Sequence, residues 1–338
     1  MLRGVLLFVL IISLSACEID GLQLRTAPDW SYRSLVAWKH ADPRGLVMSV
    51  DQHYLYIAAD VNATAFGVSL MVVNMKTGHH QILIYGMNKA SVLALAPDST
   101  LWLGEAFDDG LIWRITSPHD LPQEQQIQRL KEKSESPAIA TLRSAGVFNH
   151  QTISFSADGV YAYLADASEG GALYRFNMRS QNLQVWHQQK HWLAIDHPDE
   201  APTEARQKEA RAFDAIRGMT RMDDARLLLA ESGSGRILVL QDGEKPSIES
   251  WLENSGIQRP NSIAWDTKRQ WLWISDEGKS SWLWAWDGRY LQDIAHHNHG
   301  VLSGVHVNSG RVFVNVRRKQ GGPEAVIEIF QKHATNDD

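Results

Sequence analysis

Five polar side chains occupy equivalent places in a repeated strand pattern, each at the start of the first apolar run of its unit. They are Arg44, His150, Arg217, Asn261 and Ser303. Guanidinium groups in a narrow, partly desolvated space bind carboxylate or phosphate oxygens in a bidentate manner. Imidazole, amide and hydroxyl groups add further hydrogen bonds. If the fold brings these strand starts together, the sequence predicts a site for a small anionic ligand.

Four carboxylates near the ends of neighbouring apolar runs offer a different role for the two arginines. These carboxylates are Asp60, Asp166, Glu231 and Asp276. Each could pair with an arginine and brace a turn, in which case Arg44 and Arg217 would be structural. The residue types alone leave both interpretations open.

A histidine-rich stretch is the second group with chemical potential. It contains His296, His297 and His299, and His306 follows on the next apolar run. Imidazole is a ligand for Zn²⁺, Cu²⁺ or Ni²⁺. Adjacent histidines do not easily share one tetrahedral ion, and only Asp293 supplies a carboxylate nearby, so an exposed polar loop is the favoured interpretation and a metal site is the alternative.

The elements that would position these side chains are short strands. In Arg259–Gly288, three apolar runs are separated by breaks rich in Asp, Gly and Ser, which is typical of an antiparallel meander. The pattern recurs in five further units: Gly45–Gly78, Ser91–Thr116, Gln151–Asn177, Arg217–Gly243 and Val301–Gln331. Such repetition predicts an all-β, six-bladed β-propeller. The innermost strands of a propeller all begin at one mouth of the central channel, where the five polar side chains would converge.

Three segments lie outside the repeat. The sixth unit lacks a fourth strand, and Ser34–Trp38 can supply it, closing the ring between the chain ends. The polar segment Ser117–His150 is expected to extend the second blade. The connector His187–Ile216 between blades three and four predicts a short helical insert, with Thr203 as its N-cap.

The N-terminus has the parts of an export signal. A short positive start precedes the apolar stretch Gly4–Ala16, which is shorter than the about 20 residues that a membrane-spanning helix needs. Leu14–Cys17 resembles a bacterial lipobox, which implies lipidation of Cys17. Glu18 after the cysteine implies sorting to the outer membrane, facing the periplasm. The expected divisions are a signal peptide (1–16), a lipidated tether (17–33), the propeller (34–332) and a C-terminal tail (333–338).

Composition excludes several classes of protein. The formal charge of −6 argues against a nucleic-acid partner. Cys17 is the only cysteine, so the folded domain has neither a disulfide nor a zinc site built on cysteines. Most of the thirteen tryptophans fall within apolar runs, which predicts that they pack in the core.

Three short stretches carry a resemblance to known proteins: Pro260–Ala264, Leu272–Asp276 and Leu164–Asp166. Through them the chain resembles, over about Leu35–Phe330, the six-bladed propellers of the senescence marker protein/gluconolactonase-like, strictosidine synthase-like and NHL-repeat group. Lactonase-like members hold a divalent metal through a Glu, two Asn and an Asp on innermost strands. The resemblance places Asn261 on one Asn position, whereas Arg44, Arg217 and Ser303 replace the other ligands. A divalent metal cofactor is therefore possible, but most of its ligand set is absent.

We therefore expect an envelope-anchored propeller lipoprotein that binds a small anionic ligand, or a protein partner, at the channel mouth. The alternative is a gluconolactonase-like hydrolase or lyase with a rebuilt channel site, acting with or without a metal. A third hypothesis is a scaffold in an envelope complex that uses the flat faces of the propeller.

Overall fold

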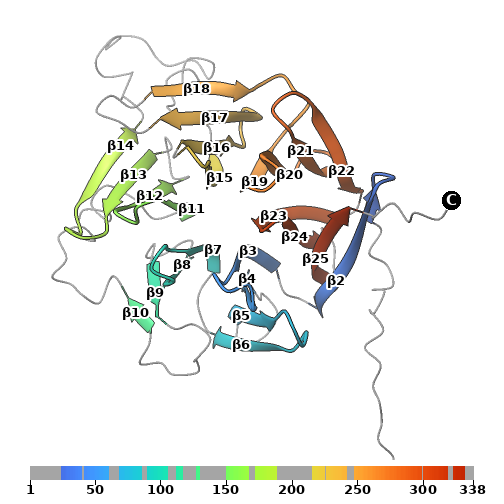
Figure 1. The fold of residues 1–338 in the computed structure, drawn as a ribbon, viewed down its shortest axis with the longest axis horizontal. Coiled ribbons are helices and arrows are strands. Elements are labelled where there is room, and N and C mark those ends of the chain that lie inside the picture. Colours follow the sequence, from blue (N-terminus) through green and yellow to red (C-terminus); the bar gives the residue numbers. More distant parts are fainter. Residues whose placement is uncertain are drawn as a thin grey trace, which may run out of the picture.

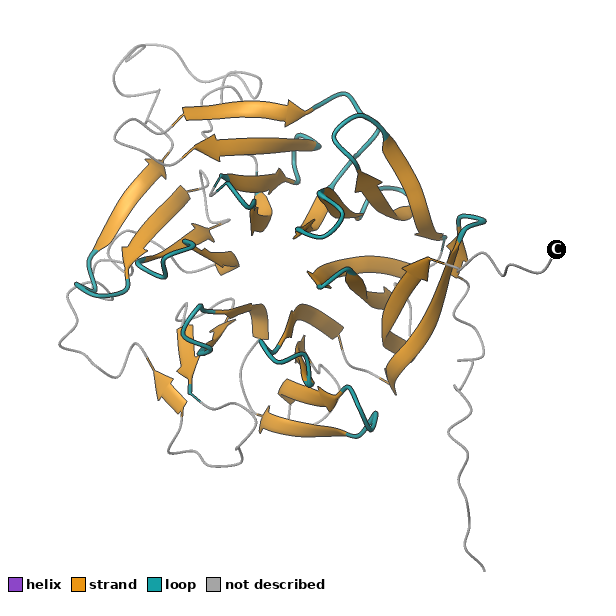
Figure 2. Ribbon diagram, in the orientation of Figure 1, coloured by secondary structure: helices purple, strands orange, loops and turns teal. Residues whose placement is uncertain are grey.

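The chain folds into a ring of six sheets around a central channel (Figure 1). The computed structural model describes residues 24–39, 42–60, 68–85, 90–105, 112–116, 127–129, 150–166, 172–188, 215–224, 226–241, 247–298, 300–318 and 323–331. Within these ranges every regular element is a strand (Figure 2). The all-β six-bladed propeller expected from the repeated strand pattern is confirmed.

Each blade is an antiparallel sheet whose strands run outwards from the channel in chain order. Blade one contains β3 (Asp42–Met48), β4 (Tyr54–Asp60), β5 (Val68–Asn74) and β6 (His80–Tyr85). Blade two contains β7 (Ala90–Leu95), β8 (Leu101–Glu105), β9 (Ile112–Ile115) and β10 (Ile127–Arg129). Blade three contains β11 (His150–Phe155), β12 (Tyr161–Asp166), β13 (Ala172–Asn177) and β14 (Leu183–Gln188).

The second half of the ring repeats this order. Blade four contains β15 (Ile216–Arg221), β16 (Leu227–Glu231), β17 (Arg236–Gln241) and β18 (Ser247–Leu252). Blade five contains β19 (Pro260–Asp266), β20 (Trp271–Asp276), β21 (Ser281–Trp286) and β22 (Leu291–His297). Blade six contains β23 (Gly300–Asn308), β24 (Arg311–Arg318) and β25 (Pro323–Gln331). The expected extension of blade two from Ser117–His150 is present as β10.

Two N-terminal strands complete the outer rim. β2 (Trp30–Lys39) pairs antiparallel with β25 and forms the fourth strand of blade six, as expected for Ser34–Trp38. β1 (Leu24–Thr26) adds a fifth strand to blade five by pairing with β22. Because β1 and the start of β2 fall within 17–33, the segment expected to be a tether belongs to the sheets from residue 24 onward.

An ion-pair cluster around the buried Glu328 carboxylate links β2 to blade six. The Glu328 carboxylate on β25 accepts hydrogen bonds from Arg33 of β2, at 2.8 Å from Nε, and from Arg311 of β24, at 2.7 Å from Nε. Burial alone would raise the pKa of Glu328, but the hydrogen bonds from both guanidinium groups outweigh it and hold the pKa below its ordinary value. The pairing that closes the ring therefore includes charged contacts as well as strand hydrogen bonds.

Apolar clusters fill the spaces between blades. The described residues form six such clusters, one at each blade-to-blade interface. Tryptophan packs in them as predicted: Trp102 meets Phe155 of the next blade edge to face at 5.4 Å, and Trp273 meets Trp30 at the same distance. Since both faces of every blade are covered, the second strands are apolar along most of their length, and charged residues stand mainly at their ends.

Every innermost strand carries a β-bulge near its start. The pairing of the first with the second strand skips one residue in each of the six blades, and the skipped residues are Arg44, Ser91, Gln151, Arg217, Asn261 and Ser303. A bulge bends its strand and re-aims the extra side chain. Each of the six bulges therefore re-aims one side chain of its blade at one end of the channel.

Some expectations concern residues that the structure does not describe. The signal peptide, Cys17 and the C-terminal tail lie outside the described residues, as does most of the expected helical insert between blades three and four. At its C-terminal end, Ile216 is not helical but begins β15. None of the described residues forms a helix long and apolar enough to cross a membrane.

Candidate functional site at the channel mouth

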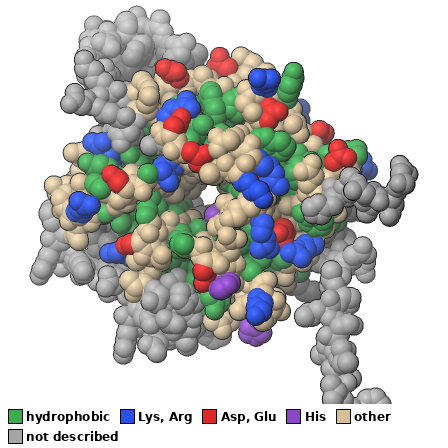
Figure 3. All heavy atoms as spheres, in the orientation of Figure 1, with side chains coloured by type: hydrophobic (Ala, Val, Ile, Leu, Met, Phe, Trp, Pro, Cys, Tyr) green, Lys and Arg blue, Asp and Glu red, His purple; other side chains and the backbone are tan. Residues whose placement is uncertain are grey.

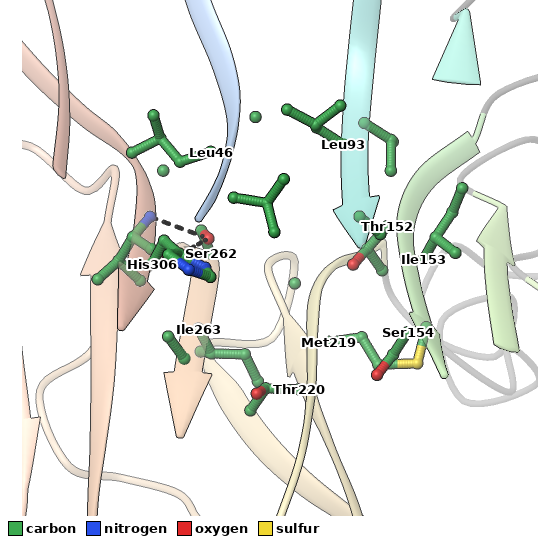
Figure 4. A pocket seen from close by; sticks show the side chains of 18 of the residues that line it. Leu46, Leu93, Thr152, Ile153, Ser154, Met219, Thr220, Ser262, Ile263 and His306 are labelled. Carbon is green, nitrogen blue, oxygen red and sulfur yellow. Dashed lines mark hydrogen bonds between the residues drawn. The ribbon is translucent and has the colours of Figure 1, made fainter. Parts of the chain in front are cut away.

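The central channel forms a cavity lined by described residues. It has a volume of about 830 Å³ and is lined by all six innermost strands. Ligand pockets for small molecules have volumes of about 300–1,000 Å³, so the space is large enough for one. Figure 4 shows apolar and hydroxyl side chains alternating around its wall, including Leu93, Thr152, Met219 and Ser262. Figure 3 shows one face of the disc, hollowed at its centre and surrounded by charged side chains of both signs.

Four of the five side chains predicted to converge do line this channel. Arg44, Arg217, Asn261 and Ser303 are bulged residues of β3, β15, β19 and β23. In blade three the bulged, channel-lining residue is Gln151; the backbone of the expected His150 pairs with Asp166, and its side chain lies outside the described residues. The channel mouth therefore presents two arginines, two amides and a serine among its described side chains.

The turn after each innermost strand is the signal that could have identified Gln151. In blade one, Ser49 begins a turn in which its hydroxyl bonds Asp51 and receives the Tyr54 backbone N–H. Ser156 does the same with Asp158 and Tyr161 in blade three. The bulged residue lies five positions before the turn serine in both blades. Counting back from the turn thus selects Gln151, whereas the apolar pattern alone suggested its neighbour.

Arg217 lies within electrostatic range of three other arginines at the channel mouth. Its pKa is lowered, first by burial and then by the positive charges of Arg259, Arg44 and Arg317, while Glu277 acts in the opposite direction. Its side chain is only 34% exposed. Among the described residues its Nε–H has no hydrogen-bond acceptor. A guanidinium stays charged at physiological pH. The lowered pKa therefore indicates that the described groups around Arg217 compensate its positive charge only in part.

Glu277 is the carboxylate within this cluster. Its Oε1 accepts a hydrogen bond of 2.8 Å from Arg317 Nη2, while its Oε2 lies 3.8 Å from Arg217 Nη1. The second distance is too long for a hydrogen bond and leaves only a charge contact. Glu277 is therefore hydrogen-bonded to Arg317 but not to Arg217. The N–H donors of Arg217 are not used by Glu277.

The carboxylates suggested earlier as partners of the arginines have other roles where the structure describes them. Asp276 accepts the backbone N–H groups of Gln258, Arg259 and Gly278 at 3.0, 2.7 and 3.2 Å and so braces a turn. Glu231 is buried and pairs with Arg236 at 2.5 Å. The side chains of Asp60 and Asp166 lie outside the described part of the chain.

Hydrogen bonds from side chains of innermost strands link neighbouring blades around the channel. The Asn261 amide Nδ2 donates to the Ser303 carbonyl, and the Ser303 hydroxyl donates to the Pro43 carbonyl at 3.1 Å. Deeper in the channel, Ser262 Oγ accepts the Val305 N–H at 3.1 Å (Figure 4). Asn261 and Ser303 thus hold blades five, six and one together at the mouth, which fixes the positions of the arginines beside them.

The histidines considered as a metal site do not come together. On β22, His297 is buried, whereas His296 is half-buried against the Trp282 ring at a centroid distance of 4.5 Å. His306 is on β23, lines the channel and accepts the Met48 N–H through Nε2 at 3.1 Å. His299 is outside the described residues. Within the described ranges no group of three His, Cys, Asp or Glu side chains is placed to hold a metal ion.

A metal of the lactonase type does not fit the donors present at the channel mouth. A hard divalent cation needs several carboxylate or carbonyl oxygens. Two of the four equivalent positions hold Arg44 and Arg217, and a third holds the Ser303 hydroxyl, which donates to a backbone carbonyl. At the fourth, Asn261 offers one amide oxygen, because its nitrogen donates to the Ser303 carbonyl, and one such ligand does not make a site. The cluster repels a cation and attracts an anion.

Comparison with known proteins shows similarity of fold only. No protein-family model and no curated protein matches the chain. Among solved structures, it is similar to a gluconolactonase of Xanthomonas campestris (15% identity, 91% of each chain, TM-score 0.63). It is also similar to virginiamycin B lyase of Staphylococcus aureus (12% identity, 90% of this chain and 100% of that one, TM-score 0.54). A third similar structure is a luciferin-regenerating enzyme (9% identity, 89% of this chain and 95% of that one, TM-score 0.62).

These likenesses show the fold alone. At such low identity they do not carry residue roles from one channel to another.

The sequence had already placed Arg44, Arg217, Asn261 and Ser303, but Arg259, Glu277 and Arg317 were missed. These three lie outside the bulge positions, just before β19, just after β20 and near the end of β24. The charge content of residues flanking each strand end is the only sequence signal that could have indicated them.

Proposed function

We propose that the protein binds a small anionic molecule at the channel mouth. The observation that carries this proposal is the setting of Arg217, which is partly buried near Arg44, Arg259 and Arg317. Among the described residues, the Glu277 carboxylate comes no nearer to it than 3.8 Å. Gathering like charges in a partly desolvated space is costly unless counter-charges are supplied. An anionic ligand would supply them.

The surroundings of Arg217 suit recognition rather than simple bracing. A structural arginine is held by close carboxylate or carbonyl acceptors, as Arg236 is by Glu231 at 2.5 Å. Arg217 instead has a carboxylate at 3.8 Å and an Nε–H without an acceptor among the described residues. A bidentate contact with a carboxylate or phosphate group would use both of its edges. The Gln151 amide, on the neighbouring blade, adds hydrogen-bonding capacity at the same mouth.

The proposal is tested by titration calorimetry of the detergent-solubilised full chain with acetate, benzoate and inorganic phosphate. Arg217→Ala should weaken binding of every anion that the unaltered protein binds, by at least tenfold. Arg221→Ala is the matched control, because Arg221 also lines the channel but lies at the opposite end of β15. Equal affinities in the unaltered protein and in Arg217→Ala would overturn the proposal.

A hydrolase or lyase with a rebuilt site is the alternative that the structural likenesses raise. It requires turnover, so lactone and ester hydrolysis should be assayed with and without Ca²⁺, Mn²⁺ or Zn²⁺, with Asn261→Ala as the control. Metal-dependent turnover that is lost in Asn261→Ala would favour the enzyme over the binder. The arginines at two ligand positions argue against that outcome.

We also propose that the propeller is held at the bacterial outer membrane, facing the periplasm, by lipid on Cys17. The support is the lipobox-like sequence Leu14–Cys17 after a short apolar stretch. Palmitate labelling of cells should mark the unaltered chain but not Cys17→Ser. Labelling that persists in Cys17→Ser would contradict the anchor.

Envelope extracts passed over immobilised protein would show whether a protein partner, rather than a small molecule, occupies the mouth.

A further inference from the structure

We infer that Asn315 is a positioning residue of the channel mouth, whose buried amide donates to the backbone carbonyl of Arg44 and so fixes the bulge that aims the Arg44 side chain. This inference rests on the proposed anion site and adds a residue that supports it from behind. It follows from one polar side chain in a layer of small residues directly below the bulges.

Asn315 differs from the residues at the same place in the other blades. It lies in the middle of β24 and pairs with Gly304, the first residue of β23 that re-enters the ladder after the Ser303 bulge. The second-strand residues at this place in the other five blades are all small: Ala58, Gly104, Ala165, Ala230 and Ser275. Packing of the blades at this layer therefore does not require an asparagine.

The Asn315 amide is buried and needs a hydrogen-bond partner. The residue is 0% exposed, and neither its Nδ2 nor its Oδ1 has a partner among the described residues. An unpaired buried amide costs free energy, and buried polar groups in folded proteins nearly always have a protein or water partner. Ser275, at the same place in blade five, has one, because its hydroxyl accepts the Ser262 N–H at 3.0 Å beside the Asn261 bulge. Asn315 is longer and can reach beyond its own blade.

The Arg44 carbonyl lies beside this amide across the boundary between blades six and one. A Cβ added to Gly304 would lie 2.7 Å from Asn315 Nδ2 and 3.1 Å from the Arg44 oxygen, so both atoms border the space that the missing side chain leaves. A carbonyl oxygen has two lone pairs and can accept this donor in addition to another. One water molecule between the two groups would make the same connection where the direct path is too long.

A hydrogen bond to this carbonyl would restrain the direction of the Arg44 side chain. Arg44 is the bulged residue of β3 and lines the channel. Its charge is one of those that, after burial, lower the pKa of Arg217, so the two guanidinium groups act in the same part of the mouth. A bulged residue is unpaired in the ladder and depends on other contacts for its orientation. Asn315 supplies such a contact without touching the ligand.

A double-mutant cycle on the detergent-solubilised full chain tests this role, using whichever of acetate, benzoate and inorganic phosphate the unaltered protein binds most tightly. Asn315→Ala, which introduces the residue found in three other blades, should weaken binding by about threefold to tenfold. In Arg44→Ala it should have no further effect, because a residue that acts through Arg44 cannot act without it. Asn315→Leu keeps a similar volume but no amide and should weaken binding equally. Ser275→Ala is the control, since its effect should be the same with and without Arg44.

The possible failures are distinguishable. If Arg217→Ala weakens binding but Arg44→Ala or Asn315→Ala does not, the role of Asn315 is wrong and the proposed anion site stands. An Asn315→Ala effect of equal size with and without Arg44, or full affinity in Asn315→Leu, would also contradict the inference and leave the site. If no probe binds in a manner that depends on Arg217, both are overturned. Urea denaturation verifies that each variant is folded, and Asn315→Leu serves in the cycle if Asn315→Ala is not.

Discussion

Arg217 Nη1 and Glu277 Oε2 lie 3.8 Å apart at the channel mouth, close enough for attraction and too far for a hydrogen bond. The other Glu277 oxygen accepts from Arg317 Nη2 at 2.8 Å. Glu277 therefore divides its charge unequally between an arginine that it holds and one that it leaves available. This inequality links the local geometry to ligand binding, because any anion that approaches Arg217 must compete with Glu277.

Removing the charge of Glu277 should strengthen anion binding. In Glu277→Gln the repulsion between the carboxylate and an incoming anion disappears while the side-chain volume is retained. We expect a gain of about 1 kcal/mol, roughly fivefold in affinity, for the anion that the unaltered protein binds best. Titration calorimetry at low ionic strength measures it. Glu249→Gln, an exposed carboxylate on β18, is the control, and weaker binding by Glu277→Gln than by this control would contradict the assignment.

His306 should make stability depend on pH. Burial lowers its pKa to about 4, compared with an ordinary value of about 6.5. Between these values the unfolded chain binds a proton that the folded chain does not, so the free energy of unfolding falls as pH decreases from about 6.5 to about 4. The slope reaches at most about 1.4 kcal/mol per pH unit. The neutral ring also accepts the Met48 N–H through Nε2, which protonation would abolish.

Chemical denaturation between pH 4 and 7 measures this contribution. His306→Gln keeps an acceptor for Met48 but cannot titrate, so its stability should fall less steeply with acidification than that of the unaltered protein. His79→Gln, in the exposed turn between β5 and β6, should keep the original slope. Parallel curves for the unaltered protein and His306→Gln would exclude His306 as the source.

The sequence was sufficient for the architecture because the apolar runs are dictated by blade packing. Each second strand is covered on both faces, so it is largely apolar, and the turns between strands favour Asp, Gly or Ser. The strand that closes the ring could be found for the same reason, since blade six lacked a fourth run and Ser34–Trp38 had no other partner. β1 was not predicted, because Leu24–Thr26 is too short to show a period.

The site was predictable only in part because side-chain direction at the mouth depends on the bulges. An extra residue in a strand changes which side chain enters the channel without changing the apolar pattern around it. Arg44 and Arg217 were predicted at positions that prove to be bulges, whereas in blade three the bulge is at Gln151, next to the predicted His150. Glu277 and Arg317 were missed because the hydrogen bond between them joins two different blades. That contact depends on how the blades are turned relative to each other.

Gly45 should be intolerant of a side chain. It belongs to the innermost strand of blade one, and a Cβ there would lie 2.7 Å from Leu93 Cβ and 2.9 Å from the Leu93 backbone nitrogen. Gly45→Ala must push blades one and two apart, so we expect a loss of about 1–3 kcal/mol in the free energy of unfolding. Urea denaturation measures it.

Gly278→Ala is the matched control for that substitution. A Cβ at Gly278 would meet chiefly the Gln258 side chain, with Oε1 at 2.5 Å, and a flexible amide can rotate away. It should cost clearly less than Gly45→Ala. Equal losses in the free energy of unfolding in the two variants would show that blades one and two can move apart more easily than the close contact with Leu93 implies.

The one-residue difference between His150 and Gln151 gives the sharpest test of the bulge geometry. Gln151 is the bulged residue of β11 and lines the channel, whereas the backbone of His150 is in the ladder opposite Asp166. If the Gln151 amide donates to a bound anion, Gln151→Ala should weaken binding by about 0.5–1.5 kcal/mol, roughly threefold to tenfold. His150→Ala should leave the affinity unchanged, as measured by calorimetry with the same anion. The reverse result, with loss in His150→Ala alone, would mean that the alignment based on the apolar pattern was correct and that the bulge does not select the ligand-binding residue.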